Sequence, residues 1–269
     1  ELVSQGREKR SSCDSTCPKV VGVFVDEGPY LPLCFLGVLI AGFTICPFDP
    51  LETESRLSKM LAHTRPLVVI LKDGSTARRV QQAAAAAGIR PPAVLLVSQL
   101  LPLDVEPSPV QREEVKSKEV EEGERISHIY FTSGSTGFPK GCVVGETALL
   151  RYCRARNEVF EFSSSSSCLL ASPHTFDPCL GDIFSTWMAG GVLCVASKRT
   201  ILSSLGKCLQ EFRASHLLTT PTLFLSLHGS LGPADLQDLR VVALGGESMR
   251  QSLVEEWGEE VLLLNVYGV

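Results

Sequence analysis

The sequence lacks several features that would point to other classes of protein. Its ten cysteines form no Cys-x-x-Cys pair and no Cys/His spacing of the kind that binds zinc. Its 25 lysines and arginines are outnumbered by 30 aspartates and glutamates, and no basic stripe carries interleaved aromatic residues. We therefore expect no zinc site and no nucleic-acid partner.

The cysteines lie scattered through apolar stretches, which is typical of buried, reduced thiols. A secreted protein of this size would be expected to pair them, so we predict a cytoplasmic protein, with only Cys13 and Cys17 ambiguous. The chain begins without methionine and without a signal-type amino-terminal region. Both ends of the sequence look cut.

One long apolar stretch, residues 29–48, carries no charged side chain over about the length that a bilayer helix needs. Prolines and glycines interrupt it at several places, which disfavours a membrane span. We predict instead a buried helix over Leu33–Ala41 that leads into a strand over Phe43–Cys46.

Short apolar runs alternate with amphipathic segments along the rest of the chain. Strands are predicted over Val20–Val25, Leu67–Leu71, Ala93–Val97, His128–Phe131, Leu169–Ala171, Val192–Ala196, Arg240–Leu244 and Val261–Leu264. Helices are predicted over Leu51–His63, Ala77–Ala87, Ile183–Ala189 and Ser204–Ala214. This alternation predicts an α/β fold of layered, parallel-rich sheets flanked by helices.

The segment 104–125 contains two prolines and a run of mixed charges without apolar periodicity. We predict a charged surface linker, the alternative being an acidic interaction site. It would separate a first α/β lobe (residues 1–103, incomplete at its amino terminus) from a second (residues 126–269, truncated at its carboxyl terminus).

The most informative segment is IYFTSGSTGFPKG, Ile129–Gly141, where an apolar strand runs into glycines and hydroxyl side chains. Gly134 and Gly137 let successive N–H groups converge on an anion, and Lys140 adds a positive charge. The spacing does not fit the Walker A pattern, which disfavours a P-loop nucleotidase. We predict a phosphate loop, with a plain Gly/Ser turn as the alternative.

This loop resembles the signature of the AMP-forming adenylate superfamily, which comprises acyl-CoA synthetases, luciferases and peptide-synthetase adenylation domains. Weaker matches follow in the order that the family shows. They are VLIAGFTICPFDP (38–50), SPHTFDPCLGDIF (172–184), TTPTLF (219–224), LRVVALGGESM (239–249) and NVYGV (265–269). The similarity covers roughly residues 20–269 and corresponds to most of the family's large amino-terminal domain, without its small carboxyl-terminal domain.

The resemblance implies that ATP and a carboxylic acid react to an acyl-adenylate and pyrophosphate, mainly through positioning and charge stabilisation. The phosphate-contacting residues that it implies are Thr132, Ser133, Ser135, Thr136 and Lys140, with Gly134 and Gly137 admitting the close backbone approach. Lys140 and Thr132 are the implied catalytic residues.

The turn at Gly245, Gly246 and Glu247 follows a predicted strand, at the end where α/β sheets leave a ligand crevice. The resemblance implies that this turn lines the adenine and that Asn265 and Tyr267 contact adenine and AMP. The alternatives are an ordinary strand-to-helix turn with Glu247 near a helix amino terminus, and a core aromatic role for Tyr267.

Phe176 and Asp177 are the predicted substrate-binding residues. In family members that activate amino acids, an aspartate at this position pairs with the ammonium group of the substrate, and a buried carboxylate requires such a cation. The alternative is that Asp177 caps a helix whose first residue is Pro178. For His174, nearby, we predict a structural role.

The strings around Asp177, Gly245 and Asn265 are most similar to β-alanine-activating members, and then to peptide-synthetase adenylation domains. We expect activation of an amino acid such as β-alanine, followed in the full-length enzyme by thioester transfer to the phosphopantetheine of a carrier domain or to CoA. The alternatives are a fatty or aryl acyl-CoA synthetase and a non-catalytic nucleotide-binding fragment.

The implied cofactors are ATP and Mg²⁺. The family's Mg²⁺-holding glutamate falls beyond Val269, so no metal ligand is predicted within the chain. The ribose-binding aspartate motif and the catalytic lysine of the small domain are also absent from the sequence. We expect the chain alone to bind ATP weakly and to complete little adenylation.

Overall fold

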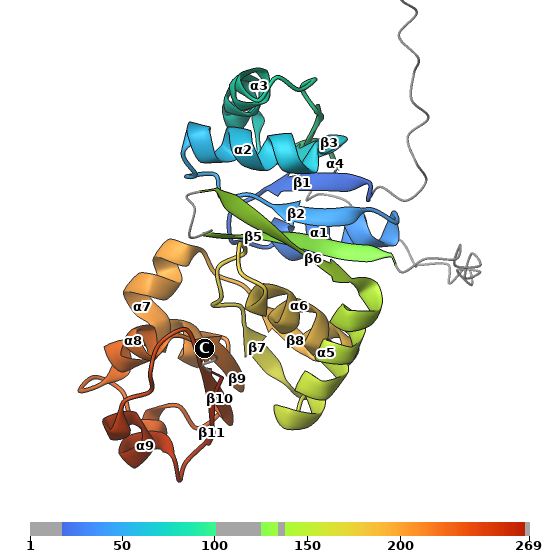
Figure 1. Cartoon of the computed structure of the whole chain (residues 1–269). Coiled ribbons are helices and arrows are strands. Elements are labelled where there is room, and N and C mark those ends of the chain that lie inside the picture. The colour runs from blue at the N-terminus through green and yellow to red at the C-terminus, as the bar shows by residue number, and fades with distance from the viewer. Residues whose placement is uncertain (1–17, 101–124, 134–137, 267–269) are drawn as a thin grey trace, which may run out of the picture.

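The computed structural model describes residues 18–100, 125–133 and 138–266, which are organised around two sheets (Figure 1). The first sheet consists of β1 (Val20–Phe24), β2 (Thr44–Pro47), β3 (Val68–Leu71), β4 (Ala93–Leu96), β5 (Ile126–Ser133) and β6 (Pro139–Gly145). The second consists of β7 (Ser167–Leu169), β8 (Val192–Cys194), β9 (His216–Thr219), β10 (Val241–Leu244) and β11 (Leu262–Asn265).

The strand order is β4-β3-β1-β2-β5-β6 in the first sheet and β11-β10-β9-β7-β8 in the second. All pairs in the second sheet are parallel. In the first sheet, β5 runs parallel to β2 but antiparallel to β6. The antiparallel pair therefore forms one edge of an otherwise parallel sheet.

Helices cover both sheets and fill the space between them. They are α1 (Tyr30–Ile40), α2 (Glu54–Thr64), α3 (Ala77–Ala86), α4 (Val97–Leu100), α5 (Glu146–Val159), α6 (Pro178–Met188), α7 (Lys198–Glu211), α8 (Pro221–Phe224) and α9 (Gln251–Trp257), with 3-10 turns at Gly74–Thr76, Leu225–Leu227 and Pro233–Asp235. Buried residues of α2 and α3 pack on the first sheet, and those of α7, α8 and α9 on the second.

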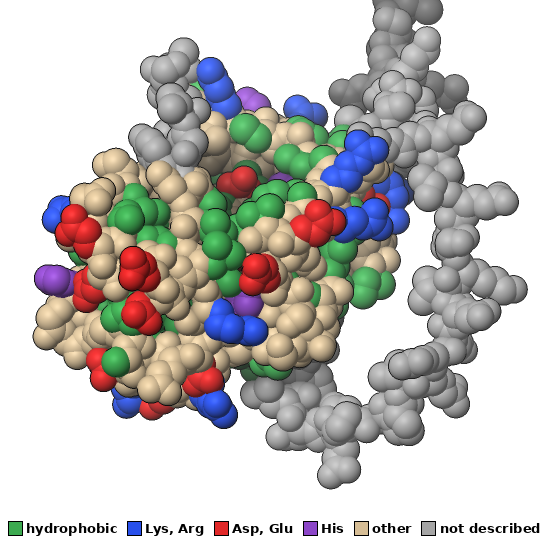
Figure 2. Space-filling model, turned by 90° about the horizontal axis from the view of Figure 1, so that it is seen from below, with side chains coloured by type: hydrophobic (Ala, Val, Ile, Leu, Met, Phe, Trp, Pro, Cys, Tyr) green, Lys and Arg blue, Asp and Glu red, His purple; other side chains and the backbone are tan. Residues whose placement is uncertain are grey.

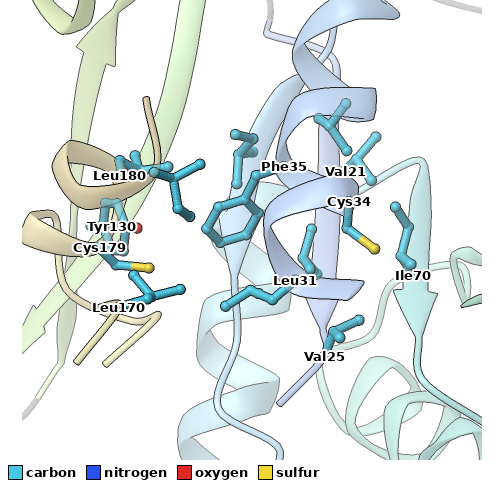
Figure 3. Close-up of a cluster of buried hydrophobic side chains, with 14 of the residues drawn as sticks. Val21, Val25, Leu31, Cys34, Phe35, Ile70, Tyr130, Leu170, Cys179 and Leu180 are labelled. Carbon is cyan, nitrogen blue, oxygen red and sulfur yellow. The ribbon is translucent and has the colours of Figure 1, made fainter. Parts of the chain in front are cut away.

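The central hydrophobic cluster joins the two halves of the molecule. Leu31 and Phe35 of α1 are fully buried, and they face Tyr130 of β5 together with Leu170 and Leu180 of the second half (Figure 3). Burying a large apolar side chain contributes about 1.5–3 kcal/mol. This shared core holds the ends of the two sheets in a fixed relation, and the candidate site lies at those ends.

The predicted α/β fold is confirmed, and most predicted strands and helices lie within a few residues of observed elements. Residues 29–48 form α1 and β2, and no helix of the described segments is long and apolar enough to cross a membrane. The predicted helix over Ser204–Ala214 begins earlier. Ser197 starts α7 by accepting a hydrogen bond from Thr200 N at 3.2 Å, and Ser204 breaks the helical backbone (φ −156°).

The sequence did not indicate β6, β9, α5 or α9. Most of the predicted linker lies outside the described residues. The predicted division into lobes stays a prediction, but β5 and β6, which follow the linker, pair with the first sheet and not with the second. The first sheet thus draws strands from both sides of the linker, because Ile45 of β2 pairs with His128 of β5.

On the face of the molecule shown in Figure 2, acidic and basic side chains are interspersed, and hydrophobic side chains gather between them.

Candidate functional site

An antiparallel strand pair flanks the predicted phosphate loop. β5 ends at Ser133 and β6 begins at Pro139, and these two residues are register partners. One step away from the loop, Thr132 pairs with Lys140, and both are exposed. Directly opposed residues of an antiparallel pair point to the same face of a sheet, so the hydroxyl and the ammonium group share one face beside the loop.

The other predicted loop residues, Gly134, Ser135, Thr136 and Gly137, lie outside the described residues, and of Ser133 only the strand position is described. Their phosphate contacts stay predictions. The strand after the loop was not predicted because Pro139 and Gly141 are unfavourable strand residues. Proline is tolerated there because it is the first residue of an edge strand.

A cavity of about 970 Å³ opens where α5 and α6 meet the carboxyl ends of β9 and β10. Phe176 and Asp177 line it together with Gly245 and Gly246. The predicted substrate motif and the predicted adenine turn therefore border one cavity, at the strand ends where parallel sheets leave a crevice. Gly246 has a φ of +81°, which favours glycine, and a Cβ on Gly245 would lie 2.9 Å from Val266 Cγ2.

Asp177 occupies the N-cap position of α6, and Pro178 is the first helical residue. The backbone of Asp177 is already helical (φ −56°, ψ −31°), and its side chain accepts no capping hydrogen bond. The side-chain half of the capping alternative is therefore wrong. The expectation of a buried carboxylate is also wrong, because Asp177 is exposed at the cavity wall beside Phe176, which is 61% exposed. Its ammonium-binding role stays a prediction.

The other residues predicted at the adenine end have different surroundings. The carboxylate of Glu247 accepts hydrogen bonds from the N–H of Thr222, at 3.2 Å, and from the Thr222 hydroxyl. It is thereby held at the first turn of α8. Asn265 is the last residue of β11, an exposed register partner of Leu244. Tyr267 lies outside the described residues.

A second cavity, of about 800 Å³, lies on the other side of the substrate motif. Tyr152, Phe176 and Asp177 line both cavities and so form a wall between them. Thr132 lines the second cavity but not the first, so the predicted substrate motif lies between Thr132 and the predicted adenine turn. Burial lowers the pKa of His128, in the same cavity, to about 4.

His174 is held by a hydrogen-bonded network, as its predicted structural role requires. Its Nδ1 lies 2.9 Å from Glu27 Oε1 and its Nε2 lies 3.2 Å from the carbonyl oxygen of Phe48. Burial raises the pKa of Glu27, but the hydrogen bond and the charge of His174 outweigh it and lower the pKa to about 2. The His174 side chain is only 4% exposed.

A second buried ion pair lies between α5 and α6. Arg156 donates a hydrogen bond through Nη2 to Asp182 Oδ1, and the two side chains are 3% and 0% exposed. The guanidinium carbon also lies 4.6 Å from the ring centre of Phe160. Arg156 lines the first cavity.

The sequence did not single out Glu27, Arg156 or Asp182. One signal was present, because Asp182 is the only charged residue in the otherwise apolar and small-residue helix α6. Such a residue needs a buried partner. Arg156 gave no comparable signal, because α5 carries other arginines as well.

The described residues contain no group of three or more His, Cys, Asp or Glu side chains that could hold a metal ion.

Comparison with known proteins decides the family. The model of the AMP-binding enzyme family matches residues 17–269. The chain belongs to the AMP-binding enzyme family. The resemblance inferred from the phosphate loop is thereby confirmed, and with it the assignment to ligases of the adenylation type.

Named members of this family similar to the chain include large synthetases. The chain is 30% identical over 268 residues to nonribosomal peptide synthetase 8 of Aspergillus fumigatus, which covers 93% of the chain and 3% of the synthetase. It is 31% identical over 253 residues to nonribosomal peptide synthetase otaB of Aspergillus niger, with 90% and 13% covered. The chain thus spans a small part of these relatives.

Solved structures of similar fold include two proteins bound to adenine nucleotides. One is the four-domain nonribosomal peptide synthetase AB3403 bound to AMP and glycine, with a TM-score of 0.72, 23% identity and coverage of 94% of this chain and 18% of that one. The other is ATP-bound MatB from Rhodopseudomonas palustris, with a TM-score of 0.74, 18% identity and coverage of 94% and 50%. At these identities the likeness shows the fold alone.

Proposed function

We propose that this protein serves an adenylation reaction in which the substrate is an amino acid, with β-alanine as the first candidate. A carboxylate oxygen of the amino acid attacks the α-phosphorus of ATP. The bond from that phosphorus to the bridging oxygen of pyrophosphate breaks, and aminoacyl-AMP and pyrophosphate result. Membership of the AMP-binding enzyme family supports the reaction class.

One observation carries the choice of an amino acid over an uncharged acid. The carboxylate of Asp177 stands at the wall of a cavity shared with Gly245 and Gly246, and it makes no capping bond to its own helix. An anionic group left free in this position is suited to pair with an ammonium group. The solved relative bound to AMP and glycine supports the same substrate class.

Lys140 and Thr132 are proposed to act on the leaving pyrophosphate. They are register partners beside the phosphate loop, so an ammonium group and a hydroxyl face the same side. As negative charge develops on the leaving phosphates, a nearby cation and a hydrogen-bond donor would stabilise it more than they stabilise the ground state. Mg²⁺ bound with ATP would neutralise further phosphate charge.

The proposal extends to the next step and to the location of the protein. Thioester transfer to the phosphopantetheine of a carrier domain, or to CoA, would consume the adenylate. The names of the peptide-synthetase relatives support the carrier. A cytoplasmic location is supported by the described cysteines, which are all free and mostly buried.

The test is ATP–pyrophosphate exchange by the protein in its complete reading frame, with β-alanine, α-amino acids and fatty acids as separate substrates. Exchange with an amino acid should fall about a hundredfold in Asp177→Asn, because the neutral amide no longer pairs with the ammonium group. Exchange only with uncharged acids, unaffected by Asp177→Asn, would instead identify an acyl-CoA synthetase. No exchange with any acid would leave a non-catalytic nucleotide-binding module.

A second variant separates substrate choice from chemistry. Lys140→Met should lower exchange with every accepted acid, by about a hundredfold, because it removes charge from the phosphate side. Lys207→Met is the matched control, since Lys207 is a 72% exposed residue of α7. Equal losses in both lysine variants would contradict a phosphate role for Lys140.

A further inference from the structure

The two nitrogens of the His174 ring both face hydrogen-bond acceptors. Nδ1 meets a carboxylate oxygen of Glu27 at 2.9 Å, and Nε2 meets the backbone carbonyl of Phe48 at 3.2 Å. Neither partner has a proton to donate at neutral pH. Both ring nitrogens must therefore donate, which makes the side chain an imidazolium paired with a carboxylate.

The charges around His174 favour this form. Burial alone would lower the pKa of His174, but Glu27 and, more weakly, Asp49 raise it above its ordinary value. Lys198 faces Glu27 from the start of α7 and helps to keep it ionised. Asp26, Lys72 and Arg199 line the adjoining cavity, where Lys72 pairs with Asp26 at 3.4 Å.

This pair links two parts of the chain that are far apart in sequence. Glu27 follows β1 and Phe48 follows β2, so both lie just beyond the carboxyl ends of strands of the first sheet. His174 lies in the turn that leads into α6, closed by a hydrogen bond from Phe176 N to Pro173 O of 3.0 Å. The turn that presents Phe176 and Asp177 is thus bonded to the first sheet through the His174 ring.

We propose that Glu27 and His174 are positioning residues that set the affinity for the substrate amino acid by holding this turn. The inference rests on the proposed function and extends it to a pair whose Glu27 lines the same cavity as Asp177. When the imidazolium loses its proton, it can no longer donate to both partners. One of the two bonds is then lost, and Asp177 is held less well.

The first test is the KM and kcat of ATP–pyrophosphate exchange by the full-length protein carrying Glu27→Gln, measured between pH 6 and pH 9. The variant removes the charge but keeps an oxygen acceptor of the same size. KM for the amino acid should rise about tenfold at pH 7, with kcat changed by less than about threefold, since small displacements of a binding group weaken binding steeply. KM for ATP should stay unchanged.

The pH profile distinguishes positioning from loss of folded protein. In the unaltered protein, KM for the amino acid should rise as the pH passes above the pKa of His174. In Glu27→Gln, burial without the carboxylate keeps the ring neutral, so KM should be high and independent of pH across that range. The proposal would be overturned if Glu27→Gln lowered kcat alone, or if KM of the variant depended on pH as it does in the unaltered protein.

A matched control exists on the surface. His228 Nδ1 lies 3.0 Å from Glu256 Oε2, with the histidine side chain 66% exposed. Glu256→Gln removes the same kind of charge from the same kind of pair, and it should leave both KM and its pH dependence unchanged. An equal rise of KM in Glu256→Gln would show that the effect does not come from the turn before α6.

A second measurement does not depend on activity. The ring ¹⁵N shifts of His174, assigned through a His174→Gln variant of the chain, should show two protonated nitrogens at pH 7.5. A singly protonated ring would overturn the inference even if exchange is observed. Conversely, a doubly protonated ring without exchange on any acid would contradict the proposed function and leave the charged state of the pair established.

Discussion

The two buried ion pairs near the candidate site are built differently. Arg156 and Asp182 join neighbouring helices, and atoms on both sides, Arg156 Nε and Nη1 and Asp182 Oδ2, have no hydrogen-bond partner. Glu27 and His174 join the two halves of the molecule, and both ring nitrogens are bonded. Buried pairs with unsatisfied atoms contribute little net stability, whereas fully bonded pairs fix an orientation. We therefore expect the Arg156–Asp182 pair to affect mainly the packing of α5 against α6, and the Glu27–His174 pair to affect mainly the geometry of the site.

The largest change in stability is expected when the Arg156–Asp182 pair is broken. Arg156→Met should lower the free energy of unfolding by about 3–5 kcal/mol, because Asp182 is left buried and unpaired. The double variant Arg156→Met, Asp182→Leu should recover most of that loss in urea unfolding. If the double variant stays as unstable as the single one, attraction within the pair contributes more than we expect.

The bonded pair should respond to pH instead. The pKa of His174 is raised in the fold, so its contribution to stability is complete below about pH 6.5 and is lost as the pH rises through the folded pKa. The pKa of Glu27 is lowered from 4.5 to about 2. Its contribution to stability is therefore complete above about pH 4.5 and is lost as the pH falls toward 2. Glu27→Gln should lower the free energy of unfolding by about 1.5–3 kcal/mol at pH 6. It should also make stability depend less on pH in both the acidic and the alkaline range. Urea unfolding of the unaltered protein and the variant between pH 2 and pH 9 measures this pH dependence. The same pH dependence in both proteins would contradict the prediction.

The space around Arg156 provides a smaller test. A Cβ on Gly181 of α6 would lie 2.8 Å from both Arg156 Nη1 and the Tyr152 hydroxyl. Gly181→Ala should therefore lower the free energy of unfolding by about 1–3 kcal/mol, although alanine is the better helix former. Gly37→Ala in α1, where no atom lies within 4 Å of the added Cβ, should instead stabilise by up to about 1 kcal/mol. Thermal unfolding of the two variants compares these opposite signs.

The smallest effect is expected for an exposed pair. Arg213 bonds both carboxylate oxygens of Asp238, at 3.0 and 3.1 Å, but the two side chains are 78% and 45% exposed. Asp238→Asn should leave the urea midpoint unchanged within error, because solvent screens the attraction. A clear shift of the midpoint would mean that bidentate geometry outweighs exposure in this protein.

Much of the fold could be predicted because its signals are local. β1 and β10 are buried along their whole length, which their uninterrupted runs of apolar or small residues indicate directly. α6 was predicted to begin at Ile183, and only the alternative interpretation of Asp177 and Pro178 placed its start at Pro178, as observed. β6 was missed because its side chains are mostly exposed and its first residue is proline.

The candidate site was only partly predictable, because some of its contacts are not local. The predicted phosphate loop and the predicted substrate motif are each indicated by a few neighbouring residues. Glu27 and His174 are 147 residues apart, and nothing near either residue indicates the other. They meet because the segments that carry them pack in a shared core, which contains buried residues of α1 and α6.

The parallel pairing of β5 with β2 has a consequence for how the protein folds. β5 and β6 can pair by themselves early, because the segment between them is short. Their docking on β2 must bring Thr44 to Ile126, which lie 82 positions apart and are joined by a hydrogen bond of 2.9 Å. Contacts of such long sequence separation slow folding. The strand pair that flanks the predicted phosphate loop should therefore be one of the later parts to reach its place. Because β1 to β4 precede this pair in the chain and are synthesised first, the edge of β2 on which it docks would stay exposed until it arrives.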